Sequence, residues 1–364
     1  MTFISRAELT ERLDPDDVAR FATELDRLWP LEDRLPDRRP DAPPNGGADD
    51  APLKLGLAVS GGPDSLALLY LAATALPGGI AVASVDHGLR PEATQEVALV
   101  EKVCAALNVP FTALSVKIAG GNLQARAREA RYAALARWVR EDGLGALATA
   151  HHADDQAETL LMRLARGSGL SGLAGVRAAH PYDPGDGSEA LALLRPLLGW
   201  RKAELEAIVA AAGVEPVRDP SNAETRFDRV RVRQHLAEHD WLDPHALATS
   251  AEHLAEAWRA IEWYAQIDWE EMVVREERSD GGLGFRYNAN VPRIIQIETV
   301  CRIISELGGV VTRGEAGRAA DRLWRGENAS LGGVLAVPTI EMIAKVGVEM
   351  RVWRFTPEPP RRVH

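Results

Sequence analysis

The sequence predicts an α/β fold in which helices cover both faces of a mainly parallel sheet. From residue 53 to about residue 195, short apolar runs alternate with longer helical patterns, and the connections between them are short. Strands that alternate with helices in this way are joined by right-handed crossovers and lie parallel in one sheet. Ligands bind such sheets beyond the carboxyl ends of the strands, so the residues that follow each strand are the candidates for chemistry.

Nine elements are expected in this region. Apolar runs typical of buried strands occur at 53–59, 80–85, 111–116, 145–150 and 191–194. Helical spacing is found at 65–76, 92–107, 122–141 and 153–166. Residues 180–190 combine proline, glycine and aspartate, and this composition is typical of a surface turn.

The regions on either side of this sheet differ in composition. Residues 5–29 have the apolar spacing of a helix and residues 30–52 the prolines of a linker, so we expect a peripheral arm without chemistry. After Pro196, helices are expected at 200–212, 243–275, 292–307 and 312–325. Alternating residues between 331 and 355 indicate a small β segment. We therefore expect four parts, at 1–52, 53–215, 216–330 and 331–364.

Composition limits the class of protein. The chain has 364 residues, of which 46% are hydrophobic, enough for a sizeable core. It has no run of about 18 apolar residues that could span a membrane. Its two cysteines, Cys104 and Cys301, form no metal or thiol-transfer motif and fit a reducing cytoplasm. The net charge of −11 argues against a nucleic-acid partner, but five arginines within residues 126–140 indicate a local basic surface.

A glycine loop follows the first expected strand. Residues 60–65 read Ser-Gly-Gly-Pro-Asp-Ser and stand between an apolar run and a helix. The backbone of such a loop can approach phosphate oxygens, and the free N–H groups of the first helical turn face the anion. The alternative is a turn that only caps the helix. The candidate nucleotide-binding residues are Ser60, Gly61, Gly62, Pro63, Asp64 and Ser65, and Asp64 is also a candidate magnesium ligand.

Polar residues also follow the second and fourth expected strands. Asp86 and His87 come directly after the second strand, where they could contact the nucleotide or simply form a capped surface turn. Residues 151–159 after the fourth strand read His-His-Ala-Asp-Asp-Gln-Ala-Glu-Thr. This density of carboxylates suits a cation, an ammonium group or proton transfer, and the alternative is an acidic helix start. The candidate catalytic residues here are His151, Asp154, Asp155 and Glu158, with Asp155 also a candidate metal ligand.

Arginines gather in two further segments. Arg128 and Arg131 lie on the helix expected at 122–141, where they could bind an anion or face solvent. A second group has the density of a phosphate-binding surface, or of a helix face held by salt bridges. Its members are Arg226, Arg229, Arg231 and Arg233.

Taken together, these motifs resemble those of the tRNA(Ile)-lysidine synthases. Residues 60–65 are similar to the PP-loop of the ATP pyrophosphatases, which split ATP into AMP and pyrophosphate to adenylate a substrate. The likeness covers about residues 53 to 240, and its segments are 85–90, 127–132, 151–161, 166–175, 194–198 and 219–222. Val230 stands where the family usually has asparagine. The resemblance implies a Rossmann-like sheet of the adenine nucleotide alpha-hydrolase type, followed by a helical domain that positions tRNA.

The resemblance also implies a reaction. ATP with Mg²⁺ would adenylate the wobble cytidine of an isoleucine tRNA that bears the anticodon CAU, and pyrophosphate would leave. The ε-amine of L-lysine would then displace AMP and form lysidine. The protein would thus be a cytoplasmic ligase that forms a carbon–nitrogen bond, and a homodimer is compatible with the sequence.

The resemblance gives roles to the candidate residues. Asp64 and Asp155 would hold magnesium, and the acids of residues 154–158 would bind the lysine ammonium or remove its proton. Arg128 and Arg131 would contact the lysine carboxylate or the adenylated intermediate. Gly167, the first glycine of the segment 167–175, would lie at the nucleotide or substrate site. The arginines of residues 226–233 would contact tRNA.

Two other classes of protein fit part of the pattern. One is another PP-loop enzyme, such as a tRNA thiolase or an amidating synthetase. Thiolases usually need paired cysteines and amidating enzymes usually need a glutaminase domain, and Cys104 and Cys301 indicate neither. The other class is a non-catalytic nucleotide-binding module, which would not need the second carboxylate cluster.

Overall fold

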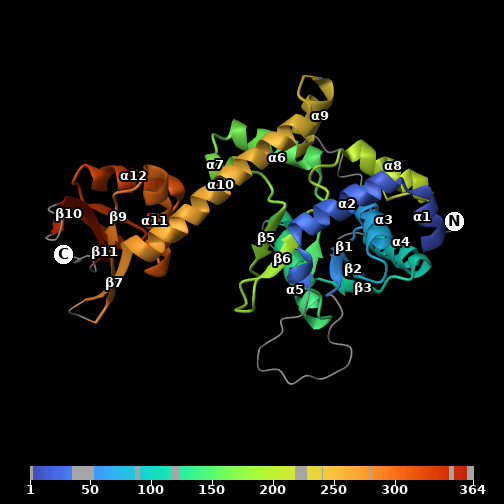
Figure 1. The fold of residues 1–364 in the computed structure, drawn as a ribbon, viewed down its shortest axis with the longest axis horizontal. Helices are drawn as coiled ribbons and strands as arrows, with labels where there is room; N and C mark the ends of the chain where they lie inside the picture. Colours follow the sequence, from blue (N-terminus) through green and yellow to red (C-terminus); the bar gives the residue numbers. More distant parts are fainter. Residues whose placement is uncertain are drawn as a thin grey trace. The chain divides into compact units, whose positions relative to one another are not determined.

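The computed structural model consists of two compact units, Met1–Ala255 and Glu256–His364 (Figure 1). It describes residues 3–34, 53–86, 91–116, 123–217, 228–239, 241–278, 281–343 and 348–358. The four parts expected from the sequence do not coincide with these two units, because the boundary between the units falls inside the part expected at 216–330; the expected division stays a prediction.

The first unit is built on a six-stranded sheet with the order β3-β2-β1-β4-β6-β5. Its strands are β1 (Leu55–Ala58), β2 (Ile80–Asp86), β3 (Phe111–Ser115), β4 (Ala146–Ala148), β5 (Ala179–Tyr182) and β6 (Leu191–Leu194). All neighbours pair in parallel except β5, which is antiparallel to β6. The predicted α/β class is confirmed, as are the five predicted strands.

Strand β5 occupies part of the segment expected to be a surface turn, so that expectation was wrong for residues 180–182. Pro181 weakens the strand signal because it cannot donate a backbone hydrogen bond. The strand forms nonetheless, since β5 lies at the edge of the sheet, where a missing donor is tolerated.

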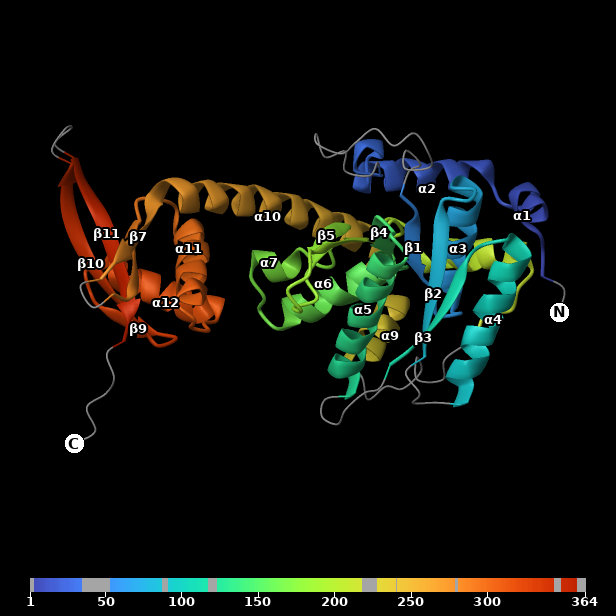
Figure 2. The same ribbon diagram turned by 90° about the horizontal axis from the view of Figure 1, so that it is seen from below.

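Helices cover both faces of this sheet (Figure 2). Alternate residues of β2 point to two different cores: Ile80 and Val82 join the core of α3 and α4, and Ala81 and Ala83 join that of α5. The chain moves from β1 outward to β3 on one side and then returns through α5 to β4 on the other side of β1. The sheet therefore has its topological switch point between β1 and β4, where α/β proteins bind ligands.

Seven helices follow β1 in the first unit. They are α3 (Pro63–Ala75), α4 (Pro91–Leu107), α5 (Leu123–Glu141), α6 (Ala153–Ala165), α7 (Leu170–Leu173), α8 (Lys202–Ala212) and α9 (Asp228–Glu238). Five of them, all except α7 and α9, agree closely with the expected segments. Helix α10 (Pro244–Met272) runs on into the second unit. None of the helices in the described ranges is long and apolar enough to cross a membrane.

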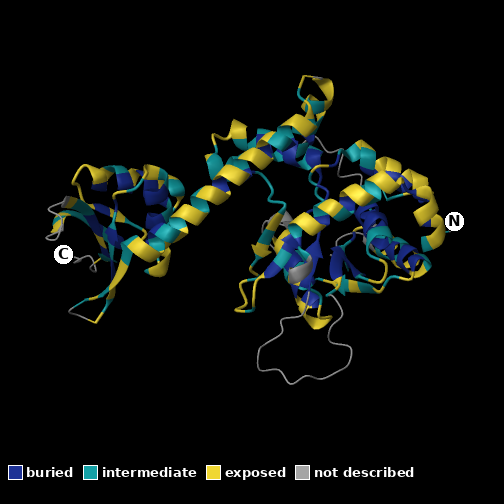
Figure 3. Ribbon diagram, in the orientation of Figure 1, coloured by how far each residue is buried: buried dark blue, intermediate teal, exposed yellow. Residues whose placement is uncertain are grey.

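Helix α3 is buried on all sides, and this explains the role of the N-terminal residues. Every residue from Ser65 to Ala73 is buried (Figure 3), so α3 needs apolar neighbours beyond the sheet. Helices α1 (Arg6–Arg12), α2 (Pro15–Leu28) and α8 supply them. Leu9, Phe21 and Leu25 are almost wholly buried in the same core.

The expected peripheral arm is therefore wrong, because the N-terminal helices belong to the core of the first unit. The single helix expected at 5–29 is also wrong, since two helices meet at Leu13 and Asp14. Leu13 has extended backbone, and the Asp14 side chain accepts from the Asp16 N–H and caps α2. The short 3₁₀ helix η1 (Leu31–Arg34) follows α2.

The second unit packs two helices against an antiparallel sheet with the order β7-β8-β11-β10-β9. Its elements are β7 (Val273–Glu277), β8 (Leu283–Asn288), α11 (Arg293–Glu306), α12 (Arg313–Trp324), β9 (Ala329–Leu331), β10 (Val334–Ile343) and β11 (Val348–Pro357). The C-terminal β segment is thus confirmed but is larger than expected. Strands β7 and β8 went unpredicted. In the case of β7, an edge strand rich in charged residues, the sequence lacks the alternation of a half-buried strand.

We expect Phe21→Ala to destabilise the first unit, because Phe21 is fully buried in the core shared with α3. The loss should be about 3–5 kcal/mol in the free energy of unfolding, measured by urea denaturation. Thr23→Ala changes an exposed residue of the same helix and should cost much less. Equal stabilities of the two variants would show that α2 is a detachable arm.

Candidate functional site

The glycine loop after β1 leaves the start of α3 open to an anion. Gly62 is the N-cap of this helix, and no side chain caps its first turn. Gly61 has a φ of +86°, a conformation that other residues rarely adopt. The Ser65 hydroxyl holds the loop together, because it accepts from the Ser60 N–H at 3.1 Å and donates to the Gly62 carbonyl at 3.0 Å. The free N–H groups of the first turn can therefore face phosphate oxygens.

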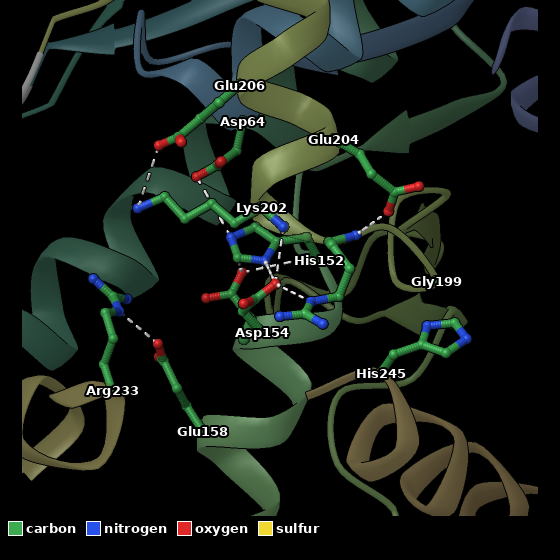
Figure 4. A network of polar contacts seen from close by, with 12 residues as sticks. Asp64, His152, Asp154, Glu158, Gly199, Lys202, Glu204, Glu206, Arg233 and His245 are labelled. Atoms are coloured by element: carbon green, nitrogen blue, oxygen red, sulfur yellow. Dashed lines mark hydrogen bonds and ion pairs between the residues drawn. The ribbon is translucent and has the colours of Figure 1, made fainter. Parts of the chain in front are cut away.

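The imidazole of His152 links this loop to the acidic cluster after β4 (Figure 4). Its Nε2 lies 3.6 Å from a carboxylate oxygen of both Asp64 and Asp155, and its Nδ1 lies 3.6 Å from Asp154. These distances are long for hydrogen bonds, so the attraction is mainly Coulombic. Burial alone would lower the pKa of His152, but the three carboxylates raise it to about 10. The ring is therefore a cation at neutral pH.

The two aspartates at the start of α6 are held as anions. The pKa of Asp154 falls to about 2: burial opposes this shift, but His152, the Lys202 backbone N–H at 2.8 Å and Arg201 outweigh it. The pKa of Asp155 is likewise lowered against burial by His152 and Arg229. The Asp155 carboxylate also accepts from the His152 N–H at 3.2 Å, which caps the helix.

Glu158 is almost fully buried and is bound by two arginines of α9. One of its oxygens accepts from Arg229 Nε at 2.6 Å, and the other accepts from Arg233 Nε at 2.6 Å. Arg229 also donates to Asp155 at 2.7 Å. Of the four arginines expected to bind phosphates, these two therefore make salt bridges with the acids. Their contact with tRNA stays a prediction, as does that of Arg231 on the same helix, and Arg226 lies outside the described residues.

His151 has the opposite electrostatic character to its neighbour. Its Nδ1 lies 3.1 Å from the Thr149 hydroxyl. Burial lowers its pKa to about 3, and the positive charges of Arg195, Arg128 and Arg229 add to this effect, although Asp155 opposes it. His151 is therefore neutral at neutral pH, next to a charged His152.

The acidic cluster opens into a pocket of about 480 Å³. Its walls come from α6, the start of α8, α9 and the start of α10. They carry two acids of the cluster, a cationic side formed by arginine and lysine, and a few apolar residues. The lining residues are Asp154, Glu158, Arg201, Lys202, Arg233, Leu236, Ala237, His239, Leu242, Asp243 and Pro244. Asp155 is absent from this wall. Its carboxylate lies on the side of Asp64 instead, because one oxygen of each is 3.6 Å from His152 Nε2.

The glycine segment after α6 is anchored to that helix. Gln156 accepts from the Val176 N–H at 2.7 Å and donates to the Val176 carbonyl at 2.6 Å. Arg163 donates to the carbonyls of Gly172 and Gly175. These contacts argue against a flexible linker. Gly167 takes a positive φ of +67° in the turn after α6, and its ligand contact stays a prediction.

The remaining candidates lie around the same edge of the sheet. Asp86 ends β2, and His87 lies outside the described residues. Arg128 and Arg131 place their guanidinium groups 4.9 and 5.4 Å from the centre of the Tyr132 ring on α5. Neither arginine makes a salt bridge among the described residues. Their anion-binding role stays a prediction.

Sequence reasoning missed four polar residues of this region. They are His152, Arg195, Arg201 and Lys202. His152 was missed because the sequence of two adjacent histidines does not indicate which of them contacts the acidic cluster. Arg195 directly follows β6 and could have been found by the same rule that selected the other strand ends. Arg201 and Lys202 reach the site through the folding of α8 against the start of α6, which no local pattern reveals.

Comparisons with known proteins agree with this geometry. Residues 45–240 match the family model of the PP-loop domain. The tRNA(Ile)-lysidine synthase of Novosphingobium aromaticivorans is 46% identical over 307 residues, which make up 84% of this chain and 89% of that protein. The enzyme of the same name from Zymomonas mobilis is 40% identical, covering 85% of this chain and 90% of its own. That from a Bradyrhizobium strain is 37% identical, covering 85% and 91%.

We expect the two adjacent histidines to titrate at opposite ends of the pH scale. In ¹⁵N NMR of the metal-free protein, His152 should stay charged until the pH approaches about 10, and His151 should stay neutral down to about pH 3. Folding raises the pKa of His152 from 6.5, so the stabilisation from its charge is complete below pH 6.5 and is lost as the pH rises toward 10. Titration of both rings near pH 6.5 would contradict the geometry.

We expect Gly175→Ala to loosen the glycine segment and lower activity. Gly175 has a φ of +68°, and an added Cβ would lie 2.5 Å from Gln156 Oε1, the atom that accepts from Val176. Gly169→Ala is the matched control, because its Cβ would meet no atom within 4 Å and its φ is −74°. Melting temperature and turnover should fall for the first variant only. Equal effects would mean that the anchor at Gln156 does not matter.

Proposed function

The chain belongs to the tRNA(Ile)-lysidine synthase family, and we propose that it uses ATP·Mg²⁺ and L-lysine in the cytoplasm to modify CAU-anticodon tRNA(Ile). The family reaction is lysidine formation on the wobble cytidine by an ATP-using PP-loop enzyme. One observation supports the assignment most directly. The phosphate loop after β1 and the acid cluster after β4 meet through His152, at the switch point of the sheet.

We assign Asp64 and Asp155 to magnesium because their carboxylates converge. One oxygen of each lies 3.6 Å from the same nitrogen of His152, so a cation can attract both at once. The other oxygen of Asp64 is buried and has no hydrogen-bond partner among the described residues. Carboxylate oxygens are the ligands that Mg²⁺ prefers, so the donor set fits the ion. When bound, the ion neutralises phosphate charge while the cytidine oxygen becomes a leaving group.

Asp154 and Glu158 are the acids that we assign to the lysine amine. Both line the pocket beside α6, whereas Asp155 does not. An ammonium group between them would be held by charge and could pass a proton to a carboxylate oxygen before attack. The free amine would then form a bond to the cytidine carbon as AMP leaves. The position of each side chain, on the wall of the pocket or beside the phosphate loop, supports this division of roles.

The cationic groups beside the pocket suit the negative charge of the RNA. Arg201 and Lys202 line it at the start of α8, and Arg233 lines it from α9. We propose that these groups help to place the anticodon loop over the acids, with Arg229 and Arg231 on the same helix. Arg128 on α5 remains our candidate for an anion of the small-molecule substrates. A homodimer stays a prediction.

We expect Asp64→Asn and Asp155→Asn each to lower lysidine formation by about 100-fold or more, because each removes a charge that faces the phosphates. The assay measures labelled lysine incorporation and AMP release with CAU-anticodon tRNA(Ile), and initiator methionine tRNA is the negative substrate. Glu101→Gln, which alters an exposed carboxylate on α4, is the matched control.

Two results would contradict the proposal. AMP release with another tRNA or acceptor, without lysine incorporation, would indicate a different PP-loop enzyme. Full activity of Asp64→Asn would show that Asp64 of the phosphate loop is not needed for the reaction.

A further inference from the structure

Two arginines are buried in the described part of the chain, and their partners differ. Arg34 is 8% exposed and pairs with Asp26. Arg195 is 4% exposed, and no carboxylate among the described residues lies within 4 Å of it. Its Nη1 donates to the Arg177 carbonyl at 2.6 Å, but its Nε is buried and has no hydrogen-bond partner in the described part of the chain. A buried charge without a counter-ion costs free energy, so this position calls for an explanation.

The surroundings of Arg195 make the imbalance larger. Burial lowers its pKa, and the charge of Arg128 adds to that effect, while Tyr132 opposes it. The Tyr132 hydroxyl is itself buried and makes no hydrogen bond of standard geometry among the described residues, but it lies close enough to Arg195 to favour the charged guanidinium. The Arg128 guanidinium lies 4.9 Å from the centre of the Tyr132 ring. Tyr132 is thus flanked by the guanidinium groups of Arg128 and Arg195, and neither arginine has a carboxylate partner among the described residues.

These groups are brought together by separate elements at the ligand-binding edge of the sheet. Arg195 directly follows β6, which pairs in parallel with β4. The Thr149 N–H donates to the Leu194 carbonyl at 3.0 Å, so the segment that leads to His151 runs beside Arg195. Arg128 and Tyr132 come from α5. Tyr132 shares one hydrophobic core with Leu193 of β6, so α5 packs beside the strand that leads to Arg195.

We propose that Arg195, Arg128 and Tyr132 form a subsite for an oxyanion of a small-molecule substrate. The ligand chemistry is a carboxylate or a phosphate, which two guanidinium groups and a hydroxyl can bind together. In the reaction proposed above, on which this inference rests, the oxyanion is either the α-carboxylate of lysine or a phosphate of the nucleotide. The subsite adds Arg195 and Tyr132 to the expected anion-binding role of Arg128.

A structural role alone does not explain Arg195. Its bond to the Arg177 carbonyl fastens the start of β5 to the end of β6, but a neutral donor would do the same without a buried charge. The Nε edge of the guanidinium is left without a partner. A site that binds an anion accounts for both facts.

The first test compares Arg195→Gln with Arg34→Gln, which removes a buried arginine that has an acid partner. KM values for lysine, ATP and tRNA are measured for both variants and for the wild type. Because one charge-assisted contact is lost, we expect KM for one small substrate to rise about 10- to 100-fold in Arg195→Gln only. Arg195→Lys keeps the charge but loses the planar, bidentate guanidinium group, and its KM should lie between those of the wild type and Arg195→Gln.

The same kinetics identify the source of the anion. Cadaverine is lysine without its carboxylate, so a carboxylate subsite predicts that Arg195→Gln no longer prefers lysine over cadaverine. A phosphate subsite predicts a raised KM for ATP and weaker inhibition by pyrophosphate. A rise in KM for tRNA alone, or no change beyond twofold in any KM, would overturn the proposal.

Thermal stability gives a second readout that a structural role would not produce. Arg195→Gln removes an unpaired charge and should keep or raise the melting temperature of the free protein, whereas Arg34→Gln should lower it. Pyrophosphate, AMP or lysine should raise the melting temperature of the wild type, and Arg195→Gln should lose the effect of the matching ligand. A fall as large as that of Arg34→Gln, with ligand effects intact, would overturn the subsite.

Two further controls keep the outcome clear. If Arg195→Gln does not fold, Arg128→Gln at the exposed end of the subsite must lose the same ligand effect, or the proposal fails. Wild-type lysidine formation is measured in parallel. Its absence would reject the proposed function, while the ligand-dependent melting still reports on Arg195.

Discussion

The parallel pairing of β1 with β4 is the constraint on which the site depends. Leu55, Gly56 and Leu57 lie opposite Ala146, Leu147 and Ala148, so the loop after one strand and the cluster after the other emerge side by side. The chain needs α3, α4 and α5 to connect these two strands, and the same helices form the two cores. Folding the sheet therefore also assembles the phosphate loop and the acids, which lie far apart in the sequence.

Two adjacent residues after β4, His151 and His152, have opposite electrostatic surroundings. His152 is surrounded by carboxylates and holds its proton, while burial, aided by nearby arginines, keeps His151 neutral. The acidic side faces the phosphate loop and the pocket, and the cationic side faces Arg195 and α5. The sites proposed for an ammonium group and for an oxyanion thus lie on the two sides of one dipeptide.

Much of this fold follows from local pattern, because the strands and helices of the first unit have clear apolar periodicity and polar residues at their carboxyl ends. The candidate site residues chosen in this way, such as Asp64 and Asp155, lie in the first turn of the helix that follows a strand. The failures have physical causes. Pro181 concealed an edge strand, the charges of β7 concealed another, and Arg201 comes to the site through tertiary packing. The burial of α2 could be inferred only after α3 was known to be apolar on all sides.

The ion pairs of Arg229 and Arg233 with Glu158 have a consequence for the measured affinity of an amine. Both oxygens of this acid already accept a hydrogen bond at 2.6 Å from the chain itself. An ammonium group at the proposed amine site would compete with these tethered guanidinium groups for the charge of Glu158, so its dissociation constant would report that competition as well as its own contacts. Weak binding of a free amine would then reflect the strength of its internal competitor, and shortening that competitor would tighten binding without adding a contact.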